Sequence, residues 1–514
     1  MAPDQDIVVL TTRERDWWWS MQEVVPALEN VWARMAEAPG MRVSFLRVPL
    51  AQQVVDSLRR SNPGTVVVTS ITAETERVAL MLRDRPGAST RFIIYLCGDS
   101  TEGFDSFGRL ADLLTAHDTL IVSSAADADA TRRCYPGAHV VVAPFPLVDQ
   151  FPLSRDVPDP GRAGASLAYV GRVSEQKNLH TLLLAMWLAR SDPLPGSGLT
   201  LDIYGAEDNL GSPNMGLTYP GYESYLRQLV DQLGLTPAVT WHGFRPRAWL
   251  FDNVHLRPHV LVSASLHSDE NFGTSVLASL AYGHQVVATA WGGHLDFQRR
   301  FPRQLSTVPV HRTWRGPAVD PGRLADALLR AVDRDAGVTQ TEVDEARSAY
   351  SEAQSAQRLR GLLFPPGPSR SRLEPSAALL RIRQNRATFG GTRKIYDGYH
   401  DPLAHEFFEA YGMGEPLGFD ADSGYFLPPW VTVSAGAVSI DDPHRGRCTL
   451  EPAREEPAVD VVVCPSMATE RLSLQTLREL VAMGYAFVLP RAEHGKAPGS
   501  QTRGQVPTRA RGGS

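Results

Sequence analysis

Two cationic side chains, Arg172 and Lys177, stand five residues apart in a loop between an apolar run and an apolar helical segment. The run SLAYV is expected to form a strand that ends near Gly171. The first turn of a helix exposes backbone N–H groups, and these groups together with two cations are suited to hold a diphosphate. Taken alone, the segment also fits a solvated basic loop.

A second anion site is predicted within residues 259–293. The strand HVLVS leads through the loop SLHSDENFG into a helix that Gly273 and Thr274 would open with bare backbone N–H groups. Gly283 stands where a glycine commonly closes a helix. Glu270 lies just before the helix, and its carboxylate could either cap the helix or accept hydrogen bonds from sugar hydroxyls.

Several motifs in these segments resemble the family-4 retaining glycosyltransferases. GRVSEQK, from Gly171, resembles the family segment in which an Arg and a Lys bind the pyrophosphate of the donor. ENFGTSVLASLAYG, followed by VVATAWGG, resembles the E-x7-E segment of the family and its Gly-Gly loop. LDIYGAEDN and VTWHGFRPR match the intervening strands and turns in order and spacing. The resemblance covers about residues 6–364 and is strong over 166–297.

The resemblance implies a role for each matching residue. Arg172 and Lys177 would stabilise the diphosphate leaving group, and Glu270 would contact the donor sugar. The donor-binding set is completed by residues that would line the sugar and phosphate pocket through their backbones, namely Gly171, Phe272, Gly273 and Thr274.

One position departs from the family pattern. The second Glu of E-x7-E, which in the family usually holds the nucleotide ribose, is replaced by Ala278. The identity of the nucleotide therefore stays open. Neutralisation of the phosphate charge is expected to matter more for the reaction than one ribose contact.

Candidates for the acceptor side follow two strands of the first third of the chain. Trp17, Trp18 and Trp19 stand where family members usually carry glycines, and their rings could stack on an acceptor or simply pack between domains. Asp99 follows the run RFIIYL, where the family often places a catalytic or substrate-contacting His or Asp. Asp99 is therefore a candidate catalytic residue, and a turn-forming Asp is the alternative.

The segments that must position these residues follow one repeated pattern, in which short apolar runs alternate with helical stretches. Continuous runs of four to eight residues predict strands buried on both faces of a parallel sheet. Twelve runs begin at Asp6, Met41, Thr65, Arg91, Asp118, His139, Ser166, Leu199, Ala238, His259, Gln285 and Ser306. The fold class is thus predicted as α/β, and with the resemblance as GT-B: two Rossmann-like, doubly wound parallel-sheet domains facing across a cleft, with ligands at the carboxyl edges of the strands.

Linkers rich in Pro and Gly divide the chain into four predicted parts. Residues 1–155 are expected to form the acceptor-side domain, and 156–364 the donor-binding domain with a closing helix. Residues 365–490 form an accessory region of unknown role, with one strand–helix–strand pattern near its end. The basic tail 491–514 is predicted to be disordered.

Composition limits the partners of the 514-residue chain. A net charge of -6 gives no reason to expect nucleic acid. No secretory leader or membrane-spanning run is visible, and a peripheral membrane contact stays open. The cysteines form no CxxC pair, which fits a reducing, cytoplasmic environment: Cys97, Cys134, Cys448 and Cys464.

No metal or other cofactor is expected, because GT-B enzymes generally need none. Asp127-x-Asp129 and Asp420-x-Asp422 are interpreted as chance, since neither follows a strand of the first domain. The histidines considered show no metal-binding spacing, although two flank the presumed pocket: His242, His267 and His294.

The resemblance implies transfer of a sugar, with retention of anomeric configuration, from a nucleotide-diphosphate donor to a carbohydrate or other hydroxyl-bearing acceptor. Ala278 and the missing glycine-rich loop favour one alternative, a GT-B relative without transfer activity that serves as a binding partner or scaffold. A sugar-nucleotide epimerase or a phosphorylase on the same two sheets is the other alternative.

Overall fold

A computed structural model describes most of the chain. The described residues are 5–12, 19–37, 39–84, 90–97, 114–147, 166–191, 198–207, 221–257, 259–266, 270–314, 316–333, 338–362, 371–388, 405–434, 437–442, 446–451 and 457–489. Trp17, Trp18, Asp99 and the tail 491–514 lie outside them, as do the three predicted boundaries, at 155/156, 364/365 and 490/491. Trp19 is described only as the first residue of a helix. No helix within these ranges has the length and apolar character needed to span a membrane.

The first sheet has six parallel strands in the order β2-β1-β3-β4-β5-β6. Its strands are β1 (Gln5–Thr11), β2 (Met41–Arg47), β3 (Thr65–Val68), β4 (Arg91–Tyr95), β5 (Thr119–Val122) and β6 (His139–Val142). The connecting helices are α1 (Trp19–Ala36), α2 (Gln52–Ser61), α3 (Ala73–Arg83) and α5 (Ala125–Cys134). Strands β4 and β5 are buried along their whole length, as their unbroken apolar runs predict.

The second sheet repeats this plan in the order β12-β11-β10-β7-β8-β9. Its strands are β7 (Ser166–Val170), β8 (Thr200–Tyr204), β9 (Val239–Gly243), β10 (Val260–Ser263), β11 (Gln285–Thr289) and β12 (Leu305–Val308). The helical elements around it are η3 (Glu175–Lys177), α6 (Leu179–Ser191), α7 (Tyr222–Gln232), α8 (Arg247–Leu250), η5 (Phe251–His255), α9 (Thr274–Ala281), α10 (His294–Arg300) and α11 (Pro321–Val332). All twelve predicted strands are therefore confirmed.

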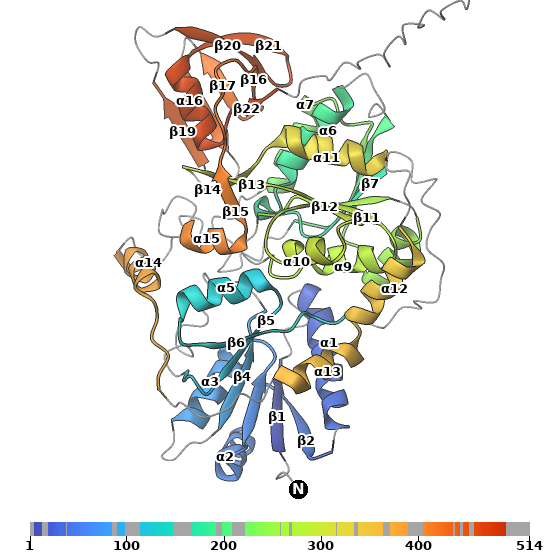
Figure 1. Cartoon of the computed structure of the whole chain (residues 1–514), viewed down its shortest axis with the longest axis vertical. Coiled ribbons are helices and arrows are strands. Elements are labelled where there is room, and N and C mark those ends of the chain that lie inside the picture. Colours follow the sequence, from blue (N-terminus) through green and yellow to red (C-terminus); the bar gives the residue numbers. More distant parts are fainter. Residues whose placement is uncertain are drawn as a thin grey trace, which may run out of the picture.

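The carboxyl edges of the two sheets face each other (Figure 1). Glu23, on the helix after β1, forms an ion pair with Arg247, which follows β9. In a second contact, the backbone N–H of Ala125 donates to the Asp296 carboxylate at 2.7 Å. Ala125 follows β5, and Asp296 follows β11. Both contacts join segments that leave carboxyl ends of strands, so the edge where parallel sheets bind ligands lies between the domains.

Two further helices, α12 (Gln340–Ala349) and α13 (Glu352–Leu362), lead the chain back to the first domain. Helix α13 packs against α1 (Figure 1), where Glu352 accepts hydrogen bonds from Asn30 at 2.8 Å and Arg34 at 3.3 Å. The closing helix predicted for the second domain thus rests on the first.

The third region begins with α14 (Ala377–Thr388) and α15 (His405–Tyr411) and continues with two small sheets. Strands β16 (Tyr425–Leu427), β20 (Ala458–Val463), β21 (Ala468–Ser473) and β22 (Phe487–Val488) form one sheet, with α16 (Leu474–Met483) beside it; β17 (Val431–Ser434), β18 (Ala437–Asp442) and β19 (Gly446–Leu450) form the other. The predicted helix from Arg471 begins later, at Leu474, because residues 468–473 pair with β20. Strand β15 (Met413–Pro416) extends a ladder of β13 (Val310–Thr313) and β14 (Gly316–Val319), which ties this region to the second domain.

Helix α15 contacts both large domains (Figure 1). The hydroxyl of its last residue, Tyr411, donates to Asp127 on α5 at 2.8 Å. The ring of Tyr411 stacks on Trp291, which follows β11, with ring centroids 5.8 Å apart. Its backbone carbonyl accepts from the N–H of Gly292 at 2.7 Å. One short helix of the third region is thus fixed to both sides of the interdomain space.

Candidate active site

The loop after β7 is held by close backbone contacts with the end of β8. The N–H of Gly171 donates to Tyr204 at 3.0 Å, and the N–H of Val173 donates to Ala206 at 2.9 Å. A Cβ atom at Gly205 would lie 1.8 Å from the carbonyl oxygen of Gly171. Only glycine fits at position 205, and this close contact fixes the position of the loop after β7 relative to the end of β8.

The same loop is joined to the loop after β10. The short helix η3 ends at Asn178 in a left-handed conformation, with φ of 56°, and α6 follows directly. The backbone N–H of Leu266, in the loop after β10, donates to the carbonyl of Gln176 at 2.9 Å. The two segments that the sequence analysis singled out are therefore bonded directly to each other.

Lys177 and Glu270, which are 93 residues apart in the sequence, form an ion pair across these two loops. Both side chains are largely buried, with 16% of the Lys177 side chain and 11% of the Glu270 side chain exposed. Glu270 does not cap α9, because the N-cap residue of that helix is Gly273, with φ of 90°. Thr274 is the first helical residue, as predicted, so the pair lies beside an N-terminus that no described side chain caps.

The environment of Glu270 keeps it ionised. Burial alone would raise the pKa of its carboxyl group, but the charges of Lys177 and His294 and hydrogen bonds from Lys177 and Ser265 outweigh burial and lower the pKa to about 2. His294 lies behind the pair, with its Nε2 atom 4.0 Å from Glu270 Oε1. Burial lowers the pKa of His294, while the charge of Glu270 raises it.

The Gly-Gly loop after β11 packs directly on the backbone around Glu270. A Cβ atom at Gly292 would lie 2.0 Å from the carbonyl oxygen of Glu270, and one at Gly293 would lie 2.4 Å from that of Phe272. Gly292 also has a positive φ of 56°. The motif order predicted from the sequence thus reflects a physical contact: both glycines are needed because the Glu270 segment lies against them.

The other predicted donor-site residues take different positions around this pair. The side chain of Phe272 is buried between the domains, 5.4 Å from the ring of Phe145, so only its backbone is placed for ligand contact. The side chain of Arg172 is half-buried, and its backbone carbonyl accepts from the Tyr169 hydroxyl at 2.5 Å. Ala278 is buried inside α9 and offers no polar group.

The predicted acceptor side cannot be placed in the same way. Asp99, Trp17 and Trp18 fall outside the described residues, and nothing is described of the Trp19 side chain. His267 also lies outside the described ranges. These assignments therefore stay predictions.

An aromatic group at the carboxyl edge of β8 and β9 was not identified from the sequence as part of the site. The ring of Tyr204 stacks on His242, with centroids 4.3 Å apart, and Trp249 lies 6.0 Å from Tyr204. Asp202 accepts a hydrogen bond from His242 at 2.6 Å. Tyr204 and His242, which end the runs LTLDIY and AVTWH, are the sequence signal for this group. In the sequence alone they are interpreted only as residues of two strands.

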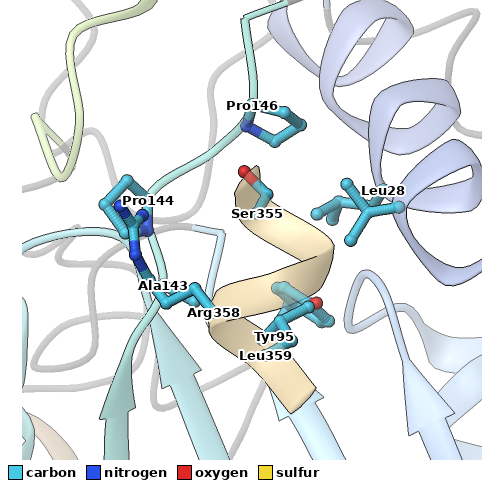
Figure 2. A pocket seen from close by; sticks show the side chains of 9 residues that line it. Leu28, Tyr95, Ala143, Pro144, Pro146, Ser355, Arg358 and Leu359 are labelled. Atoms are coloured by element: carbon cyan, nitrogen blue, oxygen red, sulfur yellow. The ribbon is translucent and has the colours of Figure 1, made fainter. Parts of the chain in front are cut away.

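A pocket of the described residues lies away from the Lys177–Glu270 pair (Figure 2). It is formed where α1, the loop after β6 and α13 meet. Its lining includes Leu28, Tyr95, Pro144, Ser355 and Arg358. None of the residues that line it belongs to the loops after β7 and β10, so the site described above does not depend on it.

Comparison with known proteins assigns the segment that contains this site to a family. Residues 162–304 match the family described as glycosyl transferases group 1. The chain contains a glycosyltransferase group 1 domain. This domain begins before β7 and ends just before β12, so it includes Arg172, Lys177, Glu270 and the Gly-Gly loop. The match identifies the protein as a glycosyltransferase.

Two solved structures are similar to the chain over most of its length. An Escherichia coli trehalose-6-phosphate protein bound with UDP-2-fluoro glucose is 11% identical and covers 71% of this chain and 100% of its own, with a TM-score of 0.50. Anabaena HepE in complex with UDP and glucose is 14% identical and covers 70% of this chain and 99% of its own, with a TM-score of 0.48. No curated protein matches the chain. The first of these likenesses, with the two facing sheets, confirms the GT-B fold class.

Proposed function

We propose that the enzyme transfers a sugar from a nucleotide-diphosphate donor to a hydroxyl-bearing acceptor, possessing the retaining chemistry that the family resemblance implies. The observation that carries this proposal is the buried Lys177–Glu270 pair beside the N-terminus of α9. A cation and uncapped helical N–H groups favour an anionic ligand, and a diphosphate is the anion that a nucleotide-sugar donor brings.

Charge balance explains why the carboxylate belongs to such a site. Without donor, Glu270 neutralises Lys177, which keeps the site stable while both side chains are buried. When the diphosphate binds, Lys177 and Arg172 turn to its oxygens, and the Glu270 carboxylate accepts hydrogen bonds from hydroxyls of the donor sugar. A hydrogen bond from Ser265 helps to hold the carboxylate in place.

The proposed step breaks the bond between the anomeric carbon and the diphosphate oxygen. A bond forms between the anomeric carbon and the acceptor oxygen on the same face of the sugar, and a phosphate oxygen takes the acceptor proton. Arg172, Lys177 and the N-terminus of α9 stabilise the negative charge that develops on the departing nucleoside diphosphate. No metal is required for this stabilisation, because protein cations supply it. We place the reaction in the cytoplasm, where nucleotide sugars are available.

Substitution of the cations tests the proposal. Lys177→Ala and Arg172→Ala should each lower turnover of the accepted donor by roughly 10²-fold or more, because each removes charge that stabilises the leaving group. Release of nucleoside diphosphate from a panel of sugar nucleotides is measured with simple sugars as acceptors, and the product anomer is assigned by NMR. Arg330→Ala, which removes an exposed cation from α11 of the same domain, is the matched control.

Two results would contradict the assignment. Near-normal turnover in Lys177→Ala would show that the pair does not serve the leaving group. Inversion at the anomeric carbon would reject the retaining mechanism while leaving glycosyl transfer itself intact.

A further inference from the structure

Three histidines meet at the amino edge of the second sheet, on the side opposite the Lys177–Glu270 pair. His255 ends η5, His259 directly precedes β10, and His284 directly precedes β11. Val260 and Gln285 are partners in the parallel ladder of β10 and β11, so the register places the last two histidines side by side. Their rings stack with centroids 3.9 Å apart.

All three histidines are buried, with 6% of His255, 5% of His259 and 3% of His284 exposed. One ring nitrogen of each lies within 4.8 Å of the corresponding nitrogen of the other two. In a tetrahedral zinc site with Zn–N bonds of 2.0–2.1 Å, the nitrogens are about 3.4 Å apart. Each pair of nitrogens would therefore have to approach by at most about 1.4 Å to reach ligand distance.

Hydrogen bonds to backbone carbonyls fix which nitrogens are available. His259 Nδ1 lies 2.9 Å from the carbonyl oxygen of Arg257, and His284 Nε2 lies 3.0 Å from that of His255. A carbonyl can only accept, so each of these nitrogens carries a proton and the other nitrogen of a neutral ring carries a lone pair. Metal-binding histidines are typically oriented by such a bond from the second nitrogen.

Two of the nitrogens in this group have no partner. Among the described residues, His255 Nδ1 and His259 Nε2 are buried polar atoms without any hydrogen bond. A buried polar atom left unpaired costs free energy, so this arrangement calls for a ligand. Burial also lowers the pKa of all three rings, to about 3 for His255 and about 4 for His259, which keeps them in the neutral form that binds metals.

We propose that His255, His259 and His284 bind one divalent transition-metal ion, with zinc as the best fit. Imidazole nitrogens suit zinc, and three of them leave one position of a tetrahedral ion to a water molecule. The site is structural, because its burial denies access to a substrate and it lies at the edge of the sheet away from the donor loops. The ion links the end of η5 to the residues that directly precede β10 and β11, two interior strands of the second sheet.

Metal content of the full-length protein tests this proposal directly. The tag-free chain is purified, stripped with a chelator and titrated with Zn²⁺ and with Co²⁺, whose visible absorption reports nitrogen ligation. One equivalent should bind, and zinc should raise the thermal unfolding midpoint of the stripped protein, because a ligand that binds only the folded state stabilises it. Absence of stoichiometric uptake by the wild-type chain would overturn the proposal.

Variants identify the ligands. His259→Gln and His284→Gln should each lower zinc affinity by at least about tenfold, because each removes one of three ligands. His242→Gln, which alters a partly exposed histidine bonded to Asp202 in the same domain, is the control and should keep wild-type affinity. Wild-type affinity in both cluster variants would overturn the assignment. If either variant fails to fold, the uptake measured on the wild-type chain still decides.

Discussion

At the carboxyl edge of the second sheet, Glu270 is buried as a carboxylate beside Lys177, whereas at the amino edge His255 and His259 are buried as neutral rings with unpaired nitrogens. The protein satisfies the first group internally, by a partner from another loop. In the second group, one ring nitrogen of His255 and one of His259 have no hydrogen-bond partner among the described residues. The comparison suggests two kinds of site in one sheet: one whose internal pair is exchanged for substrate, and one completed by a permanent ligand.

The largest effect is expected where the carboxyl edge is most tightly packed. Gly292→Ala should lower the free energy of unfolding by about 2–5 kcal/mol, because it combines a left-handed backbone with a clash against the Glu270 carbonyl. Chemical denaturation measures the change, and transfer should be lost along with it.

A matched variant separates the two causes. Gly234 also has a positive φ, of 65°, but no atom lies within 4 Å of a Cβ built there. Gly234→Ala should therefore cost only about 1–2 kcal/mol. Equal losses in the two variants would show that the contact between Gly292 and Glu270 contributes nothing.

The ionised state of Glu270 gives a pH-dependent prediction of intermediate size. Its pKa is about 2 in the folded protein against an ordinary value of 4.5. A carboxyl group with a lowered pKa contributes stability that is present above about pH 4.5 and is lost as the pH falls towards 2. Glu270→Gln lacks this contribution, so its stability should approach that of the wild type over the same interval. A constant difference between pH 6 and the acid limit would argue that Glu270 is not an ionised partner of Lys177.

The smallest effect concerns the attachment of the third region to the carboxyl edge. Tyr411→Phe removes the buried hydrogen bond to Asp127 and should lower the free energy of unfolding by about 1–2 kcal/mol. Because the lost bond joins α15 to Asp127, which follows the carboxyl end of β5, donor kinetics should change more than metal uptake at the amino edge. KM for the donor and zinc affinity are measured on the same variant. A change in zinc affinity alone would contradict the view that the two edges of the sheet act independently.

The sequence predicted the second sheet and its carboxyl edge well, for a physical reason. Unbroken runs such as HVLVS and QVVAT, alternating with helical stretches, are typical of strands buried on both faces of a parallel sheet, and the ends of such strands converge on one edge. The resemblance assigned Lys177 and Glu270 to one donor site, but their direct ion pair was not predicted, since their separation of 93 residues carries no local signal.

The amino edge was missed because its histidines are brought together by register. His255 and His259 are four residues apart, but His255 ends η5 and His259 directly precedes β10, so the H-x3-H pattern does not lie within one helix. His284 joins them only through the pairing of β10 with β11. The docking of α15 was missed as well, since the aromatic residues around Phe407 do not reveal which domain they contact. Asp99 and the tryptophans after β1 remain untested predictions.

The attachment of α15 also constrains how the enzyme can open. Helix α15 is bonded to α5 through Tyr411 and Arg133, and to the second domain through Gly292 and Arg312. A rotation that separates the two halves must break one of these two sets of bonds, and the half that keeps its bonds will carry α15 with it. Any separation of the two domains would therefore be coupled to the third region through α15.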